Sequence, residues 1–296
     1  MNENNSKSYV MIISSMLIFG TIGIFRRYIP ISSGLLAFSR GLLGGAFLLL
    51  FVLARGGRLA RIEGKKLLLL ALTGAVMGMN WICLFEAYNY TAVSTATMCY
   101  YMQPTIVILL SPLVFKERLS LKKLLCAAAA IVGMVFVSGM TEGGGIQAQD
   151  ITGILYGLAA AALYATVVIM NKKVQIDDDY EKTIIQLVSA AVILIPYLLL
   201  TEDFSKISLD ALAVVMVLIV GLVHTGIAYA LYFGSMKGLK AQSVAVLSYI
   251  DPVFALILSA IVLGEKLSAF GIFGAVLVIG SAIVSEISLK KNIQKR

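Results

Sequence analysis

Residues 101–120 read YMQPTIVILLSPLVFKERLS, and residues 249–268 read YIDPVFALILSAIVLGEKLS. The two stretches align without a gap, and eight of their positions are identical. Each places a proline, Pro104 or Pro252, inside a long apolar run, where it removes a backbone hydrogen bond that a continuous helix would make. The chain therefore contains an internal repeat, and its two copies share the same helix-breaking feature.

The repeat extends beyond these two stretches. The same spacing of 148 residues relates three further pairs, namely Gly78 and Gly226, Trp81 and Tyr229, and Phe85 and Phe233. We therefore predict that the chain consists of two similar halves, residues 1–145 and residues 146–296.

The composition indicates a membrane protein. Hydrophobic residues make up 59% of the chain and charged residues 14%, and the mean hydropathy is +0.93. A soluble domain carries about 25% charged residues, because it needs a polar surface around its core. The net charge of +8 does not point to nucleic acid, since the basic residues lie in short connections between apolar runs. We predict a multi-pass protein of the cell membrane.

Ten apolar runs are long enough to cross a bilayer, which takes about 20 residues. They cover approximately residues 9–25, 32–54, 67–88, 92–115, 121–140, 151–170, 183–201, 211–233, 241–263 and 268–285. Backbone polar groups at membrane depth must bond within their own segment, so each run is predicted to be a helix. The first run belongs to the repeat pattern, and we interpret it as a retained span rather than a cleaved signal. The predicted fold is an all-α integral membrane protein with ten transmembrane helices.

The basic residues orient these helices. Nineteen lysines and arginines lie in the two tails and in the loops after the even-numbered spans, whereas four lie on the opposite side. Because lysine and arginine accumulate on the cytoplasmic side, both termini are predicted to be cytoplasmic. Each half holds five spans, an odd number, so the two five-helix repeats must be inverted relative to each other. Inverted repeats of this kind build secondary transporters, with the substrate site near the middle of the membrane.

The chain resembles the EamA-like branch of the drug/metabolite transporter superfamily. The likeness rests on two five-span repeats, each with a Pro-containing helix, a Glu-x-Leu-Ser turn and a glycine-rich last helix. It covers nearly the whole chain. The resemblance implies a ten-helix secondary carrier that moves small metabolites, often amino acids and frequently outward. It leaves open the substrate, the direction of transport and the energy source.

Four ionisable residues interrupt the predicted spans: Arg40, Glu86, His224 and Asp251. A charge in the middle of a membrane is costly, so each of them is a candidate for binding or for coupling. Asp251 and His224 lie at about the same depth on neighbouring spans, and a contact between them would suit proton handling. The alternative is a neutral histidine bonded to a backbone carbonyl and an acid that faces a water-filled cavity.

A polar residue precedes each of the two prolines, Gln103 in the first copy and Asp251 in the second. Irregular backbone at this depth is tolerated where it lines a cavity, so we predict that these residues form two walls of one central cavity. A simple packing kink is the alternative. Arg40 is a candidate ligand for a substrate carboxylate, although it also has the reach to pair with Glu86 or to extend to the interface. Glu86 alternatively faces interfacial water.

Aromatic residues lie on the same spans as these polar residues. The predicted substrate-binding set is Trp81, Tyr101, Gln103, His224, Tyr229, Tyr249 and Asp251. An aromatic stripe also serves packing alone, and that alternative stays open for the aromatic members of the set.

The sequence argues against an enzyme. A single histidine cannot form the HExxH zinc motif, and the chain lacks the GxSxG nucleophile elbow and the GxxxxGK[ST] nucleotide loop. Three cysteines within apolar runs do not suggest a disulfide framework or a zinc site. We expect no cofactor, no metal and no nucleic acid. The expected partners are a small-molecule substrate, the lipid bilayer and, as a candidate, protons, in a monomer or a homodimer.

The leading prediction is a secondary active transporter that exports amino acids or related metabolites by alternating access through a central cavity between the repeats. A proton-coupled multidrug or cationic-amine exporter is the alternative. A channel is a third possibility, although rings of like charge, which favour a channel, are not visible in the sequence.

Overall fold

The computed structural model describes residues 3–57, 59, 62–116, 119–138, 147–174, 176, 178–204, 210–236, 239, 244, 247–266 and 268–287. Within these residues every regular element is a helix, which confirms the predicted all-α class. Parts of the predicted loop 142–150 and of the predicted ninth span, 241–263, lie outside the described residues.

The helices follow one another with short connections. In the first half of the chain they are α1 (Glu3–Gly20), α2 (Ile22–Arg27), α3 (Ser33–Ala54), α4 (Gly64–Tyr90), α5 (Val93–Tyr100), α6 (Gln103–Phe115) and α7 (Leu121–Val137). In the second half they are α8 (Ala148–Lys173), α9 (Asp179–Thr201), α10 (Ala211–Leu218), the π-helix η2 (Ile219–Ile227), α11 (Ala228–Met236), α13 (Ile250–Val262) and α14 (Ala269–Ile287).

Seven segments of the described chain are long and apolar enough to cross a membrane. They are Ser6–Arg27, Ser33–Ala54, Gly64–Tyr90, Val93–Val114, Ala148–Lys173, Asp179–Thr201 and Ala211–Met236. These segments match the first four predicted spans and the sixth to eighth, and the chain is therefore a multi-pass membrane protein. Two shorter apolar helices, Ile250–Val262 and Ala269–Ser285, lie within the last two predicted spans, and α7 lies within the fifth.

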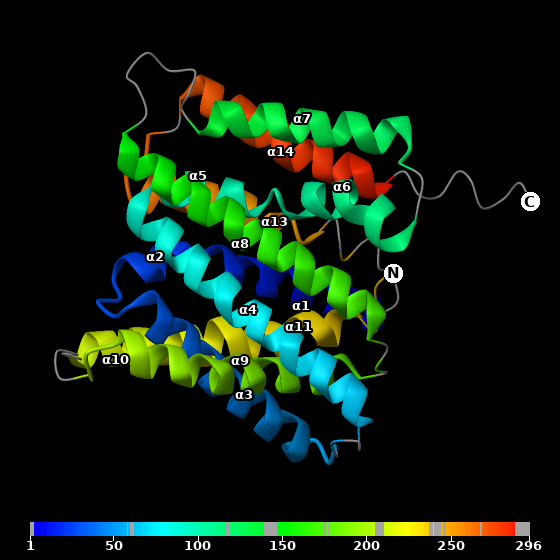
Figure 1. Ribbon diagram of the computed structural model, residues 1–296, viewed down its shortest axis with the longest axis vertical. Coiled ribbons are helices and arrows are strands. Elements are labelled where there is room, and N and C mark those ends of the chain that lie inside the picture. The colour runs from blue at the N-terminus through cyan, green and yellow to red at the C-terminus, as the bar shows by residue number, and fades with distance from the viewer. Residues whose placement is uncertain are drawn as a thin grey trace, which may run out of the picture.

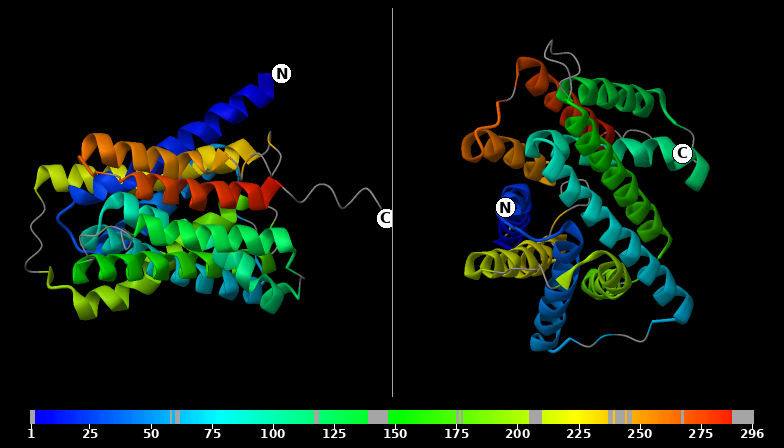
Figure 2. Two further views of the ribbon diagram at one scale, coloured as in Figure 1. Left: turned by 90° about the horizontal axis from the view of Figure 1, so that it is seen from above. Right: turned by 60° about the vertical axis from the view of Figure 1, so that its left-hand side comes forward.

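The helices lie side by side and run between two ends of the molecule (Figures 1 and 2). The start of α1 and the end of α14 lie at one end, and the turn between α4 and α5 lies at the opposite end, which we call the distal end (Figure 1). Helices of the two halves pack on each other: α4 contacts α8 and α9, and α3 contacts α9 and η2. The two halves are therefore interleaved rather than separate units.

The two repeated prolines mark the starts of helices. α5 ends at Tyr100, and α6 begins at Gln103 with Pro104 in its first turn. In the same way α13 begins at Ile250, with Pro252 in its first turn. A proline is well tolerated there, because the first N–H groups of a helix have no partner within the helix. Each proline thus lies in the first turn of an apolar helix, α6 or α13.

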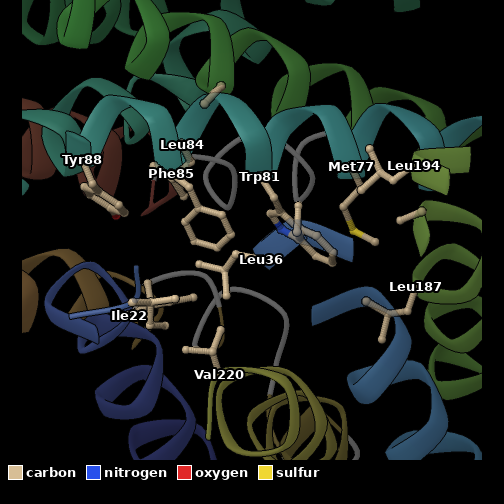
Figure 3. Packing of buried hydrophobic residues seen from close by; sticks show 14 of the residues in the cluster. Ile22, Leu36, Met77, Trp81, Leu84, Phe85, Tyr88, Leu187, Leu194 and Val220 are labelled. Carbon is tan, nitrogen blue, oxygen red and sulfur yellow. The ribbon is translucent and has the colours of Figure 1, made fainter. Parts of the chain in front are cut away.

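Small residues let the helices approach closely. Gly41 packs against Ala191 and Gly74 against the Gln186 carbonyl, both on α9, and Gly157 packs against Cys99 on α5. One face of α4 fills the space between these helices. Figure 3 shows Trp81, Leu84, Phe85 and Tyr88 pointing from α4 toward Ile22, Leu36 and Val220. This packing fixes the backbone on which the polar residues described next are mounted.

Candidate functional site

A cavity of about 130 Å³ lies where the broken helices meet. It is bounded by α1 and α2, α3, α4, α5 and α6, α8, α11 and α13. Six of the nine predicted site residues line it, namely Arg40, Trp81, Tyr101, Gln103, Tyr229 and Asp251. This volume is slightly smaller than that of an engineered cavity of about 150 Å³ that holds benzene, so the cavity is on the scale of a small molecule.

Arg40 supplies the positive charge of the cavity. Its side chain is 5% exposed, its Nε donates to Thr225 Oγ1 at 2.8 Å, and its guanidinium carbon lies 4.5 Å from the centre of the Trp81 ring. Among the described residues it forms no ion pair and no further hydrogen bond. The terminal guanidinium nitrogens are therefore left to bind a group in the cavity, while Thr225 and Trp81 fix the orientation of the guanidinium plane.

Glu86 lies elsewhere. It is half-buried and accepts a hydrogen bond from Asn89 Nδ2 at 3.3 Å, near the distal end of α4. The predicted alternatives in which Arg40 pairs with Glu86, or extends to the interface, are therefore wrong for this structure. The sequence placed the two residues within reach, but α3 directs Arg40 inward, onto the indole ring of Trp81.

Asp251 supplies the negative charge. The Tyr101 hydroxyl donates a hydrogen bond to Asp251 Oδ2, and no described side chain donates to Oδ1. Further tyrosines extend the wall on this side, since the Tyr100 and Tyr164 rings are 5.5 Å apart and both line the cavity. A carboxylate held by a single neutral donor keeps one oxygen available for a cationic ligand.

The two residues that precede the prolines occupy matching places. Gln103 begins α6, Asp251 lies in the first turn of α13, and both line the cavity. Gly20 makes this possible on the side of α1, because a Cβ there would lie 2.8 Å from the Asp251 carbonyl oxygen. Pro252 itself is buried and Pro104 is half-buried.

His224 does not meet Asp251. It is 1% exposed within η2, where Nε2 lies 2.7 Å from Thr21 Oγ1 and Nδ1 lies 3.4 Å from the Ile219 carbonyl oxygen. Its ring packs edge-on against Phe25, with the ring centres 4.8 Å apart. The predicted contact with Asp251 is therefore not formed. His224 contacts the Ile219 backbone carbonyl instead, as in the alternative that the sequence left open. His224 lies behind the cavity wall rather than in it.

Tyr249 also stands behind the wall. It precedes α13, is 8% exposed, and its ring centre lies 6.4 Å from that of Tyr101. The sequence missed Tyr100 and Tyr164 as cavity residues. A signal for Tyr164 was present, because a tyrosine hydroxyl halfway along an apolar span needs a polar neighbour.

The cavity thus presents two opposite charges that are not paired with each other through any hydrogen bond or ion pair of the described residues. Leaving two such groups unpaired in a buried site is costly unless a ligand completes them. A small molecule that carries both a carboxylate and an ammonium group satisfies both at once.

Comparisons with known proteins agree on the class of protein. The family model described as "EamA-like transporter family" matches residues 6–139 and again residues 151–286. An uncharacterized transporter of Bacillus subtilis (strain 168) is 27% identical over 94% of this chain and 88% of its own length. A "Probable amino-acid metabolite efflux pump" of Salmonella typhimurium is 30% identical over 60% of this chain and 61% of its own length.

A protein with the same printed name from Escherichia coli (strain K12) is 27% identical over 70% of this chain and 72% of its own length. A solved crystal structure superposes on 95% of this chain and 96% of its own with a TM-score of 0.66, at 20% sequence identity. That likeness shows a common fold.

Proposed function

The chain belongs to the EamA-like transporter family, and we propose that it is a secondary active carrier that exports an amino acid or a related zwitterionic metabolite. The observation that carries the proposal is the pair of unpaired opposite charges, Arg40 and Asp251, in one small cavity. The printed names of two relatives, which are amino-acid metabolite efflux pumps, support the same substrate class.

In this proposal the substrate carboxylate accepts hydrogen bonds from the free nitrogens of Arg40. The ammonium group donates to Asp251 Oδ1, and the substrate's side chain packs on Trp81 and Tyr229. Charge-assisted hydrogen bonds are the strong ones, and the planar guanidinium suits a carboxylate. The rings of Trp81 and Tyr229 supply apolar area for a small side chain.

We infer that transport proceeds by alternating access between two inverted five-helix repeats, ten membrane helices in all. The two separate family matches, 6–139 and 151–286, support a division near residues 145 and 146. The start of α1 and the end of α14 lie at the same end of the molecule, which supports an even number of crossings (Figure 1). The excess of basic residues in the tails and in the loops at that end favours the cytoplasmic side of the cell membrane for both termini.

A cationic-amine or multidrug exporter is the second candidate, because Asp251 alone would hold an amine. The unpaired Arg40 argues against it, since a buried guanidinium in the same cavity repels a cation that brings no carboxylate. A channel is disfavoured for a related reason. Rings of like charge select ions in a pore, whereas this cavity presents one charge of each sign.

Binding and counterflow together test the proposal. L-Alanine, L-threonine and L-leucine are compared with their methyl esters, which lack the carboxylate, and their N-acetyl forms, which lack the ammonium group. We expect at least one parent amino acid to raise the thermal unfolding midpoint of the purified protein and to drive saturable counterflow in proteoliposomes. Neither modified form of that amino acid should do so. Equal stabilisation by the methyl ester would favour the amine exporter instead.

A further inference from the structure

The turn between α4 and α5 is unusual for a loop because it is buried. Thr91 is 7% exposed and Ala92 is half-buried, and Val93 and Ser94, which begin α5 and which we count with this turn, are 1% and 2% exposed. Loops normally run over the surface of a protein and show their backbone to solvent. Other parts of the chain must therefore cover this turn, at the distal end of the molecule, and supply partners for its polar groups.

Three charged residues from distant parts of the sequence supply these partners. Arg27, at the end of α2, donates from Nη2 to the Thr91 carbonyl oxygen at 2.7 Å. The Thr91 hydroxyl donates to Asp150 Oδ1, in the first turn of α8, at 3.1 Å. Glu265, in the turn after α13, accepts hydrogen bonds from Val93 and Ser94. The distal ends of α2, α8 and α13 thus converge on one short turn.

Glu265 makes the most contacts of the three. Its Oε1 accepts from the Val93 backbone N–H at 2.7 Å, and its Oε2 accepts from the Ser94 N–H at 3.0 Å and the Ser94 hydroxyl at 2.8 Å. α5 has no side-chain cap from its own N-cap residue, Ala92. A carboxylate at this position satisfies N–H groups that the helix cannot satisfy itself, and it complements the positive end of the helix dipole.

The backbone conformation of Gly264 directs the Glu265 side chain toward the turn between α4 and α5. Its φ is +66°, a conformation that most L-residues adopt only with strain, and it lies directly after the end of α13. A Cβ at Gly264 would meet no atom within 4 Å. The glycine is therefore required by the backbone conformation alone, and it reverses the chain so that the carboxylate returns toward α5.

The turn separates two spaces. On one side, Thr97 of α5 and Tyr88 of α4 line the central cavity. On the other side, Thr91 and Ser94 line a second, polar pocket of about 290 Å³ together with Asp150 and Glu265. α2 closes the remaining gap, because a Cβ on Gly23 would lie 2.5 Å from Val93 Cγ1.

We propose that the turn Thr91–Ser94 is the distal gate of the carrier and that Glu265 is the latch that holds it shut. The inference rests on the alternating-access function proposed above. The latch is connected to the binding site, because α5 and α13 pack together and also carry Tyr101 and Asp251 at their other ends. A substrate ammonium group that binds Asp251 Oδ1 pulls on the carboxylate that Tyr101 holds through Oδ2, and so acts on the same helix pair whose distal ends Glu265 joins. Glu265 is thus a positioning residue, since it acts on the gate and does not touch the cavity.

Accessibility of the cavity from the distal side tests this inference. The reporter is Thr97→Cys in a background in which Cys83, Cys99 and Cys126 are replaced by alanine, in right-side-out proteoliposomes. A membrane-impermeant thiol reagent is added outside, and the labelling rate is measured without substrate. We expect Glu265→Ala to raise this rate about tenfold, equivalent to about 1.4 kcal/mol of lost closure. Lys266→Gln, which changes the charge of the neighbouring residue in the same turn, should leave the rate unchanged.

A second pair of variants keeps the Glu265 carboxylate and changes the residue before it, Gly264. Only one variant of the pair should move the carboxylate away from the turn. Gly264→Asn tolerates the left-handed conformation, whereas Gly264→Val does not, and neither side chain meets a neighbour at its Cβ. We expect fast labelling for Gly264→Val and background labelling for Gly264→Asn, and this pair decides the outcome if Glu265→Ala fails to fold. Labelling rates in Glu265→Ala or Gly264→Val within twofold of the background would overturn the latch. Because the assay needs no substrate, a failure of amino-acid counterflow would refute the carrier proposal separately.

Discussion

The Tyr101 hydroxyl donates a hydrogen bond to the carboxylate of Asp251, 150 residues further along the chain, and so joins the end of α5 to the start of α13. The bond connects the two halves of the protein at the wall of the central cavity. It also leaves Asp251 Oδ1 free to face the cavity. Asp251 is thus held by one neutral donor at Oδ2, and its Oδ1 is left for a cationic group or a proton.

The first prediction concerns Asp251 as the residue that couples transport to a proton gradient. Asp251→Asn keeps the shape of the side chain and removes its charge. We expect this variant to fold and insert but to lose the response of net amino-acid transport to a pH gradient across proteoliposomes. Tyr101→Phe is the matched control, because it removes the hydrogen bond to Asp251 and keeps the carboxylate. It should retain the gradient response with an altered KM. A normal gradient response in Asp251→Asn would show that coupling lies elsewhere.

The second prediction assigns the substrate carboxylate to Arg40. Arg40→Gln removes a charge-assisted contact, which is worth about 1.5–3 kcal/mol, so amino-acid affinity should fall about 10- to 150-fold. Arg40→Lys should also bind weakly, because lysine loses the bond to Thr225 and the planar stack on Trp81. Titration calorimetry measures both variants. An amino-acid methyl ester gives the control: it brings no carboxylate for Arg40 to bind, so Arg40→Gln should bind it no more weakly than the wild type does.

The third prediction concerns packing between α4 and α9. A Cβ on Gly74 would overlap the Gln186 carbonyl oxygen, whereas a Cβ on Gly64, in the same helix, would meet nothing within 4 Å. We expect Gly74→Ala to destabilise the protein by about 1–3 kcal/mol through overpacking. Gly64→Ala should be neutral or slightly stabilising. Thermal unfolding in detergent compares the two variants. Equal unfolding midpoints would contradict the prediction, because they would mean that α4 moves to accommodate the extra methyl group without a loss of stability.

The fourth prediction concerns topology. Gln147 lies just before α8 and Lys65 lies in the first turn of α4, at opposite ends of membrane-crossing helices. If the termini are cytoplasmic, a cysteine at position 147 should react with an impermeant reagent added to intact cells. A cysteine at position 65 should react only after the cells are opened. Labelling of both positions from the same side would refute the predicted ten-span arrangement.

The features that the sequence predicted well are those with a large energetic cost. A proline has no backbone N–H to donate, which suits it to the start of a helix, and Pro104 and Pro252 both lie in the first turn of a helix, α6 and α13. A charge at mid-depth must face polar surroundings, and Arg40 and Asp251 both line the cavity. The depth of a residue in the membrane, and the energetic cost of a charge there, follow from its position along a helix. A single sequence is therefore enough to predict them.

Orientation around a helix axis was harder to predict. The depth of His224 suggested a contact with Asp251, but η2 is a π-helix, so the usual period of about 3.6 residues per turn does not give the direction of its side chains. The role of Glu265 was also hidden. The Glu-x-Leu-Ser turn was visible as a repeated motif, yet the N–H groups that Glu265 binds lie 171 and 172 residues earlier. Contacts between distant segments require the folded arrangement.

The last prediction gives His224 a structural role. Its Nε2 bonds to Thr21, the residue between α1 and α2, and so ties η2 to the break in the first membrane-crossing segment. Loss of a buried hydrogen bond costs about 1–3 kcal/mol, so His224→Gln and Thr21→Val should each lower the thermal unfolding midpoint. The double variant should cost little more than the larger single change, because both remove the same bond. His224→Gln should keep the response of transport to a pH gradient. Loss of that response at native stability would make His224, rather than Asp251, the proton-coupling residue.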